Sequence, residues 1–414
     1  MNIIHGMNDY LKGVDRALGG LVNRALASQP VVVLTGARQT GKSTLVRHLA
    51  KPRRYVTLDD VEVLERAERE PDALLEGKEP LTIDEVQRAP ALLLAIKRAV
   101  DERRTPGRFV LTGSADLALM KGVSESLAGR VAHFSLWPLT RRERLGRGAV
   151  GRWSALFAAP EHTWPDVLAD DDAPNEVWED LVRIGGYPTP RLHLADAEAR
   201  ALWFAGYTQT YLERDLRQLS EVASIVDFRR LMRAVCLRIG NVANQTELGR
   251  DVGMPQPTVR RHLDLLELSY QLVRLPAYAV NRTKRLIKSP KLYWADTGLA
   301  MYLAGETTPR GAHLENLVLG DLLAWRGTIA DGPALMYWRT TTGDEVDFVI
   351  EHEGRVFPVE VKATARPRLD DVRSLVTFRE EYGRRCGPGL LLHTGDELGW
   401  LANGVLACPI WRVL

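Results

Sequence analysis

The chain has 414 residues, of which 45% are hydrophobic, and this is enough to build the cores of two or three domains of ordinary size. The formal net charge of +2 is a balance of many charges of both signs, so it excludes no partner and a nucleic-acid surface has to be found in local patches. We find neither an apolar run near the ~20 residues of a membrane span nor a signal-peptide pattern at the start. We therefore expect a cytoplasmic protein without a membrane partner.

The first 150 residues alternate between short apolar runs and helical segments. The runs are VVVLTG, YVTLDD, LTIDEVQ and RFVLTGS, and each ends in polar residues. Strands that alternate with helices form a parallel sheet covered on both faces, and ligands bind at the carboxyl ends of such strands. The pattern predicts an α/β domain over residues 1–150 with its site at that edge of the sheet.

The segment GARQTGKS lies between the first of these strands and a helix, and it fits the phosphate-binding loop pattern. Gly36 and Gly41 allow backbone N–H groups to approach phosphates, while Lys42 reaches the β and γ phosphates. The hydroxyl of Ser43 is the predicted Mg²⁺ ligand, and Thr44 follows it as a further nucleotide-binding residue. The motif therefore predicts binding of ATP with Mg²⁺.

Two acidic residues, Asp84 and Glu85, follow the strand LTI. We expect Asp84 to hold the Mg²⁺ shell and Glu85 to orient or deprotonate the attacking water. The strand FVLTGS ends in hydroxyls, so Ser114 or Thr112 is the candidate sensor of the γ-phosphate. Arg130 in SLAGR is the candidate arginine finger, which would act on the nucleotide of a neighbouring subunit in a dimer or in a ring such as a hexamer.

The order of these motifs resembles that of a known family. VVVLTGARQTGKSTLV, LTIDEVQRAP, FVLTGSA, SLAGRV and LWPLT follow one another as in the AAA+-like P-loop ATPases of the AAA_14 type, which prokaryotes carry fused to a C-terminal domain of unknown function. RIGGYP and YLERDL resemble the middle region of that family, and Arg214 and Asp215 look like its middle-region pair. The resemblance covers nearly the whole chain and implies that the glycine, lysine, hydroxyl and acidic residues of the two motifs form a nucleotide site.

Two segments are predicted between the ATPase domain and residue 300. Residues 176–240 have helical periodicity and are expected to form a helical lid or connector, after a stretch at 151–175 whose prolines and acidic run are typical of a linker. Residues 241–300 look like a winged helix. Its two helices are expected in QTELGRDVG and PQPTVRRHLDLLELSYQLV, and its two wing strands in YQLVRLPAY and KSPKLYWAD.

Basic residues gather on the second of these helices and on the wing. Arg260, Arg261 and His262 lie in the would-be recognition helix. The following segment NRTKRLIKSPK contains five cations without an intervening acidic residue, at Arg282, Lys284, Arg285, Lys288 and Lys291. Because such a cluster neutralises the phosphate backbone, the unit is predicted to bind DNA. The alternative is a winged helix that contacts only protein.

The last segment, residues 311–414, opens with a helix and continues with two alternating strands in GDEVDFVIEHEGRVFPVEVKA. The first strand is predicted to point two sets of side chains to opposite faces, one being Val346, Phe348 and Ile350 and the other Glu345, Asp347 and Val349. A turn at Gly354 would then bring Asp347 close to Glu360 and Lys362, which share a face of the second strand.

This pattern resembles the PD-(D/E)xK nuclease core, which includes Holliday-junction resolvases. In that core two carboxylates, here Asp347 and Glu360, bind Mg²⁺, and the lysine, here Lys362, stabilises or activates a water that attacks a phosphodiester. An acidic residue on the preceding helix completes the site, and Glu315 in HLENLVLGDLLAW is the candidate. The same fold is reused as a DNA-binding or structural shell, so the pattern predicts an α/β nuclease-like domain and leaves cleavage open.

Together the segments favour a DNA-dependent motor that hydrolyses ATP as a homo-oligomeric ring and acts on branched or duplex DNA such as Holliday junctions. The alternative is a nucleotide-dependent switch of the signalling or defence type, which binds a protein partner through the winged helix and the C-terminal domain. A third interpretation is a nuclease that ATP only regulates.

Overall fold

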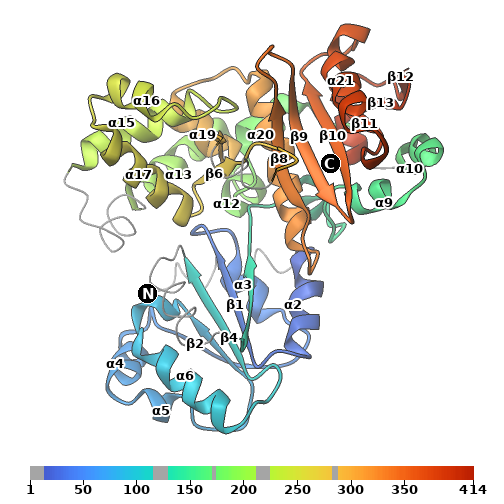
Figure 1. Cartoon of the computed structure of the whole chain (residues 1–414). Coiled ribbons are helices and arrows are strands. Elements are labelled where there is room, and N and C mark those ends of the chain that lie inside the picture. The colour runs from blue at the N-terminus through green and yellow to red at the C-terminus, as the bar shows by residue number, and fades with distance from the viewer. Residues whose placement is uncertain (1–13, 115–128, 170–173, 211–223, 282–287) are drawn as a thin grey trace.

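The computed structural model describes residues 14–114, 129–169, 174–210, 224–281 and 288–414. Figure 1 shows a lower unit, drawn in blue and cyan, and an upper part in which a cluster of helices and a second sheet lie side by side. The expected α/β architecture with a parallel sheet at its start is confirmed. No helix within these ranges has the length and apolar character that crossing a membrane requires.

The lower unit is built on a five-stranded sheet with the order β2-β3-β4-β1-β5, and every strand pair in it is parallel. Val31 and Val33 of β1 pack with α6, whereas Val32 and Leu34 pack with α2 and α3, because alternate residues of a strand face opposite sides. Its described elements are α2 (Leu18–Leu26), β1 (Val31–Gly36), α3 (Lys42–Arg47), β2 (Arg54–Thr57), α4 (Val61–Arg69), α5 (Pro71–Leu74), β3 (Leu81–Asp84), η1 (Val86–Arg88), α6 (Ala91–Glu102), β4 (Phe109–Ser114) and β5 (Val131–Ser135).

A helical region follows the first sheet. The composition of residues 151–175 indicates a linker. The described part of this segment instead forms short helices, and their Trp153 and Trp164 side chains are fully buried in the hydrophobic core. The described helices up to the wing are α8 (Arg141–Arg144), α9 (Trp153–Ala158), η2 (Glu161–Thr163), α10 (Trp164–Ala169), α11 (Trp178–Ile184), α12 (Pro188–Leu192), α13 (Ala197–Thr210), α15 (Ile225–Cys236), α16 (Gln245–Val252) and α17 (Gln256–Leu268).

The three-helix unit formed by α15, α16 and α17 is followed by the antiparallel pair β6 and β7, which is the hairpin expected for the wing. The second sheet has the order β12-β13-β11-β10-β9-β8. The remaining described elements are β6 (Leu272–Leu275), β7 (Lys291–Trp294), α19 (Thr297–Ala304), α20 (Gly311–Gly327), β8 (Ala334–Arg339), β9 (Glu345–His352), β10 (Arg355–Lys362), η4 (Leu369–Val372), α21 (Arg373–Tyr382), η5 (Gly383–Arg385), β11 (Gly389–His393), β12 (Gly399–Ala402), β13 (Val405–Pro409) and α22 (Ile410–Val413).

One continuous hydrophobic core joins the three-helix unit to the second sheet. Phe228 of α15, Leu263 of α17, Leu322 of α20 and Phe348 of β9 are all buried members of this core. The opposite face of the sheet packs against α21 through a separate cluster that includes Phe378. The segments predicted as lid, winged helix and C-terminal domain therefore share their packing, and their boundaries stay predictions.

A bulge in β9 changes which side chains face α20. Val349 pairs with Met336 and Val346 pairs with Trp338, so two residues of β9 lie between these pairs where β8 has one. The expectation that Val346 shares a face with Phe348 is therefore wrong: Val346 packs on the α21 side with Val349, whereas Phe348 packs on the α20 side. Such an extra residue re-aims the neighbouring side chains.

A buried carboxyl group, Asp321 of α20, gives a prediction for the pH dependence of stability. Its Oδ1 accepts hydrogen bonds from Trp153 Nε1 at 2.6 Å and from the Gly151 amide at 2.9 Å, and burial raises its pKa to about 6 despite these bonds. Between pH ~4 and ~6 the folded chain holds a proton that the unfolded chain has lost, so this group makes stability fall as pH rises. Asp321→Asn should show a flatter melting temperature across that window.

The comparison requires melting curves of both proteins from pH 4 to pH 7. Asp331→Asn makes the same chemical change at an exposed position and should reproduce the wild-type profile. Equal pH profiles for wild type and Asp321→Asn would contradict the assignment.

Candidate nucleotide site and acidic cluster

The phosphate-binding loop connects β1 to α3 in the conformation that its glycines require. Gly36 has a φ of 146°, and a Cβ there would lie 2.4 Å from the carbonyl oxygen of Leu136. Gly41 has a φ of 95°, which L side chains rarely adopt. Lys42 begins α3 and is buried, and its Nζ donates to the carbonyl oxygens of Gly36 and Ala37, both at 2.9 Å. Ser43 and Thr44 form the first turn of α3 and are half-buried.

The acidic residues at the end of β3 contact the hydroxyls at the end of β4. Asp84 is buried, and it accepts hydrogen bonds from the hydroxyls of Tyr55, at 2.5 Å, and Thr112. Glu85 Oε2 accepts hydrogen bonds from Ser114 Oγ, at 3.1 Å, and from the Gln87 amide. Both candidate sensors thus touch a predicted acidic residue, Thr112 touching Asp84 and Ser114 touching Glu85. Burial, together with the charge of Asp84, raises the pKa of Tyr55, which therefore acts as a donor.

Glu85 has a left-handed backbone conformation, with a φ of 59°. This conformation is uncommon for a residue with a Cβ, and such positions gather at functional sites. It turns the chain sharply after β3, so that Asp84 points into the sheet edge while Glu85 contacts the end of β4.

Arg130 lies at the other end of the same sheet. It immediately precedes Val131, which pairs with Val31, the first residue of β1. Its Nε donates to Asp101 Oδ1 at 2.6 Å. In its own subunit Arg130 is therefore at the amino edge of the sheet, whereas the phosphate-binding loop is at the carboxyl edge.

A pocket of about 280 Å³ opens beside the phosphate-binding loop and α3. Two of the residues that line it, Arg16 and Pro188, are not indicated by the nucleotide-binding motifs of the sequence. Arg16 lines it and donates to the Thr40 carbonyl at 2.7 Å and to the Trp137 carbonyl at 2.6 Å. Pro188, from RIGGYP, also lines the pocket near Gly41. The match of RIGGYP to the middle region of the resembled family is the sequence signal that could have indicated this segment. The pocket adjoins the residues that would bind the phosphates.

Tyr270 connects this edge of the sheet to the three-helix unit. Its hydroxyl is hydrogen-bonded to Thr35 Oγ1 at 2.6 Å and to Ser135 Oγ at 3.2 Å, at the ends of β1 and β5. Its ring packs edge-on against Trp137, and its backbone φ is 57°. Because Tyr270 follows Ser269, which caps α17, the turn directly after the would-be recognition helix contacts the strand that enters the phosphate-binding loop.

The basic residues predicted to contact DNA differ in their exposure to solvent. Arg260 and Arg261 are exposed on α17. His262 is instead buried against Phe228, and burial lowers its pKa, so the expectation of a cationic surface residue is wrong there. Lys291 is also buried, which removes it from any DNA surface. Three further predicted contacts, Arg282, Lys284 and Arg285, lie outside the described residues, as do Arg214 and Asp215.

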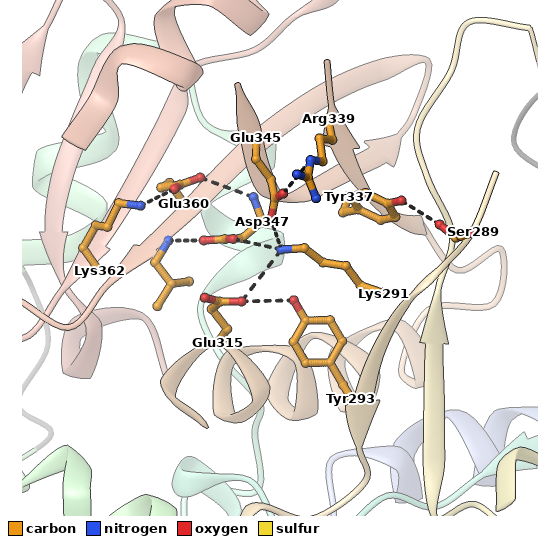
Figure 2. Close-up of polar contacts among 11 residues, drawn as sticks. Ser289, Lys291, Tyr293, Glu315, Tyr337, Arg339, Glu345, Asp347, Glu360 and Lys362 are labelled. Atoms are coloured by element: carbon orange, nitrogen blue, oxygen red, sulfur yellow. Dashed lines mark hydrogen bonds and ion pairs between the residues drawn. The ribbon is translucent and has the colours of Figure 1, made fainter. Parts of the chain in front are cut away.

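The side chains proposed for a nuclease site lie together in an acidic cluster, which consists of Glu315 of α20, Glu345 and Asp347 of β9 and Glu360 of β10. Figure 2 shows that Lys291 of β7 points into the cluster from the wing side and Lys362 approaches from the other side. Asp347 Oδ2 accepts a hydrogen bond from the Val361 amide at 3.0 Å, and the Asp347 amide donates to Glu360 Oε2 at 3.3 Å.

Two lysines compensate the charge of the acidic cluster. Lys291 Nζ lies 2.5 Å from Glu345 Oε1 and 3.3 Å from Asp347 Oδ1, and Lys362 Nζ lies 2.6 Å from Glu360 Oε1. Burial opposes the charge on Lys291, but Asp347 and the other carboxylates outweigh it and raise its pKa. Burial and, next, the charge of Asp347 raise the pKa of Glu360 and of Glu315 above the usual range of a glutamate.

These residues do not fit a magnesium site. Among the described residues, no three His, Cys, Asp or Glu side chains are arranged to hold a metal ion. The ammonium of Lys291 stands among the carboxylates where a cation would bind. The predicted Mg²⁺ ligands Asp347 and Glu360 therefore have lysine partners in this structure.

Comparisons with known proteins agree with the P-loop geometry. Residues 28–145 match the AAA domain family, residues 175–310 match a domain of unknown function (DUF8612), and residues 310–413 match another (DUF4143). An uncharacterized protein of Mycobacterium tuberculosis is 35% identical over 403 residues, which cover 95% of this chain and 83% of that protein, and one of Mycobacterium bovis gives the same values.

The solved structures that match this chain are more distant in sequence. The Walker-type ATPase of Pyrococcus abyssi is 19% identical with a TM-score of 0.44, and the match covers 69% of this chain and 94% of that chain. AMPPCP-bound DnaA from Aquifex aeolicus is 16% identical with a TM-score of 0.28, over 60% of this chain and 86% of that chain.

The AAA domain match over residues 28–145 supports an ATPase of the AAA type that binds ATP, and the candidate phosphate-binding loop and the acidic pair after β3 lie within this range. The prediction of a P-loop ATPase domain is thereby confirmed. The chain belongs to the same family as the two mycobacterial proteins.

Proposed function

We propose that this AAA-type ATPase couples ATP hydrolysis to DNA bound at the three-helix unit, and that Tyr270 transmits the coupling. The 2.6 Å contact between the Tyr270 hydroxyl and Thr35 Oγ1 carries the proposal. Thr35 directly precedes Gly36 of the phosphate-binding loop, and Tyr270 closely follows α17. A movement of the loop during the ATP cycle would therefore reach the DNA-binding helix through one hydrogen bond.

The hydrolytic roles follow from the chemistry of the residues at the loop. Lys42 would exchange its two carbonyl partners for the phosphates, which are stronger acceptors. Ser43 and Asp84 would hold Mg²⁺ through the hard oxygen ligands that it prefers, which would supply positive charge beside the β and γ phosphates. Glu85 would orient or deprotonate the attacking water, and Ser114 would hold its carboxylate in place.

DNA is the proposed effector because α17 presents two arginines to solvent. Arg260 and Arg261 are exposed on one helix, and arginines in such positions contact the phosphate backbone of duplex or branched DNA. A homo-oligomer is part of the proposal, since Arg130 lies at the far edge of its own sheet and would reach only the nucleotide of a neighbouring subunit.

The first test measures ATP hydrolysis with and without single-stranded, duplex and four-way-junction DNA. Wild type should be stimulated by at least one of these, and Tyr270→Phe should keep its basal rate but lose most of the stimulation. The variant removes one hydroxyl, whose net contribution to stability is about 0.5–1.5 kcal/mol, so it should still fold.

Tyr302→Phe makes the same change on α19, where the tyrosine is partly exposed, and should retain full stimulation. Turnover that is unaffected by every DNA structure would overturn the proposal. Stimulation that survives in Tyr270→Phe would overturn the role of Tyr270 alone.

A second candidate is a nucleotide-dependent switch that binds a protein partner through the same unit. The inward position of His262 and Lys291 favours it, because two of the cations predicted for a DNA surface are buried. This candidate predicts that Arg260→Glu with Arg261→Glu leaves ATP turnover unchanged in the presence of DNA. DNA cleavage is not part of either proposal, because the acidic cluster fits a lysine and not a metal ion.

A further inference from the structure

The acidic cluster contains a cation that the chain itself supplies. Lys291 Nζ lies within 4 Å of three carboxylates, at 2.5 Å from Glu345, 3.3 Å from Asp347 and 3.9 Å from Glu315. The Lys291 side chain is only 2% exposed. Since the carboxylates come from α20 and β9 and the lysine from β7, the contact joins three elements that are distant in the sequence.

Lys291 is held in place by its backbone and by aromatic neighbours. It pairs with Leu275 in the β6–β7 hairpin and forms a bridge with Val242 on the other side. The Tyr337 ring lies 5.8 Å from its Nζ, and the Tyr337 hydroxyl donates to the Ser289 carbonyl two residues before Lys291. The Lys291 ammonium group is therefore positioned by an ordered strand and does not belong to a flexible surface side chain.

The remaining members of the cluster are already satisfied. The Tyr293 hydroxyl, also on β7, donates to Glu315 Oε2 at 3.2 Å. Arg339 Nε lies 3.5 Å from Glu345, and Lys362 pairs with Glu360. A divalent cation added to this arrangement would face the charges of two lysines and an arginine at close range, and like charges in a poorly solvated site repel strongly.

We propose that Lys291 is an internal substitute for a divalent cation, which fills the acidic cluster and makes the C-terminal unit a metal-free structural shell. The proposal concerns the C-terminal cluster alone, and it holds or fails independently of ATP hydrolysis and DNA binding.

The test uses the full chain without nucleotide and Mn²⁺ as the probe, with binding followed by the loss of the free-ion electron paramagnetic resonance signal. Wild type should show no Mn²⁺ binding that depends on Asp347. Lys291→Met should melt several degrees lower, because it leaves buried carboxylates without their cation. It should also gain a Mn²⁺ site, and Mn²⁺ should restore part of the lost melting temperature.

Three controls separate this effect from general damage. Lys291→Arg keeps the charge and should bind no Mn²⁺ even if it is less stable. Lys362→Met removes the second lysine, whose side chain is 37% exposed, and should gain no site. Adding Asp347→Asn to Lys291→Met should abolish the gained site.

Two results would overturn the proposal. One is saturable binding of Mn²⁺ to wild type that disappears in Asp347→Asn, which needs only variants that retain Lys291 and stays decisive if Lys291→Met fails to fold. The other is a folded Lys291→Met that neither loses stability nor gains a Mn²⁺ site.

Discussion

The Glu85→Gln variant is expected to bind ATP as tightly as wild type and to hydrolyse it about 10²–10⁴-fold more slowly, which is the usual contribution of a positioned general base. Glutamine keeps the shape of the side chain and a carbonyl oxygen that can accept from Ser114, but it cannot take a proton from water. The structure places the carboxylate beside Ser114 and Gln87 at the carboxyl edge of the sheet, where the γ-phosphate would lie. The measurements are phosphate release under saturating ATP and equilibrium binding of a fluorescent ATP analogue.

A matched variant controls for the loss of a negative charge. Glu79→Gln makes the same change on the loop before β3, where the side chain is 59% exposed and pairs with Arg54 across 3.5 Å. It should hydrolyse ATP at the wild-type rate. Wild-type turnover by Glu85→Gln would show that another group activates the water, and weakened ATP binding would show that Glu85 has a different role.

The Gly185→Ala variant is expected to lose roughly 3–5 kcal/mol of stability, the sum of a strained backbone and an overpacked contact. Gly185 follows α11 with a φ of 71° and a ψ of −163°, a combination that only glycine adopts readily. A Cβ there would lie 2.4 Å from Asp296 Oδ1. The Asp296 carboxylate accepts from the Gly186 amide at 2.6 Å and from the Leu299 amide at 2.8 Å, so displacing it would also uncap α19.

The midpoint of urea unfolding measures this loss. Gly206→Ala is the matched control, because Gly206 is exposed within α13 and a Cβ there meets nothing within 4 Å. Alanine in a helix interior is about 1 kcal/mol more favourable than glycine, so this control should be neutral or stabilising. Equal midpoints for Gly185→Ala and wild type would mean that the RIGGYP segment adapts without cost.

Local motifs in the sequence predicted the P-loop ATPase domain and the positions of the residues in its candidate nucleotide site. The eight residues of GARQTGKS include the glycines, the lysine and the hydroxyl that define the phosphate-binding loop pattern. The run LTIDE places Asp84 at the end of a buried strand. Periodicity also located the helices α16 and α17 and the strands β6 and β7 that follow them.

Residues whose partners lie far away in the sequence were not predictable in this way. Lys291 sits in KSPK, which looks like a solvated basic loop, and its partner Asp347 is 56 residues away. Tyr270 is 235 residues from Thr35, and nothing in SYQLV marks it as a contact of the phosphate-binding loop. The bulge in β9 could not be predicted from the alternation of apolar and polar residues. Both faces of that strand are buried, so apolar side chains occur on either face.

The last residues of the described chain have a consequence for the order of folding. Arg141 donates to the carbonyl oxygens of Trp411 and Leu414, and Arg142 donates to that of Val413, at separations of 270, 273 and 271 residues. Both arginines lie in α8, directly after the ATPase sheet. A ribosome adds about 5–20 residues per second, so these two guanidinium groups would be synthesised roughly 15–50 s before the three carbonyl groups near the end of the chain. During that interval the first sheet can fold and Arg141 can already pair with Glu176, but the contacts of α8 with the last residues are still missing.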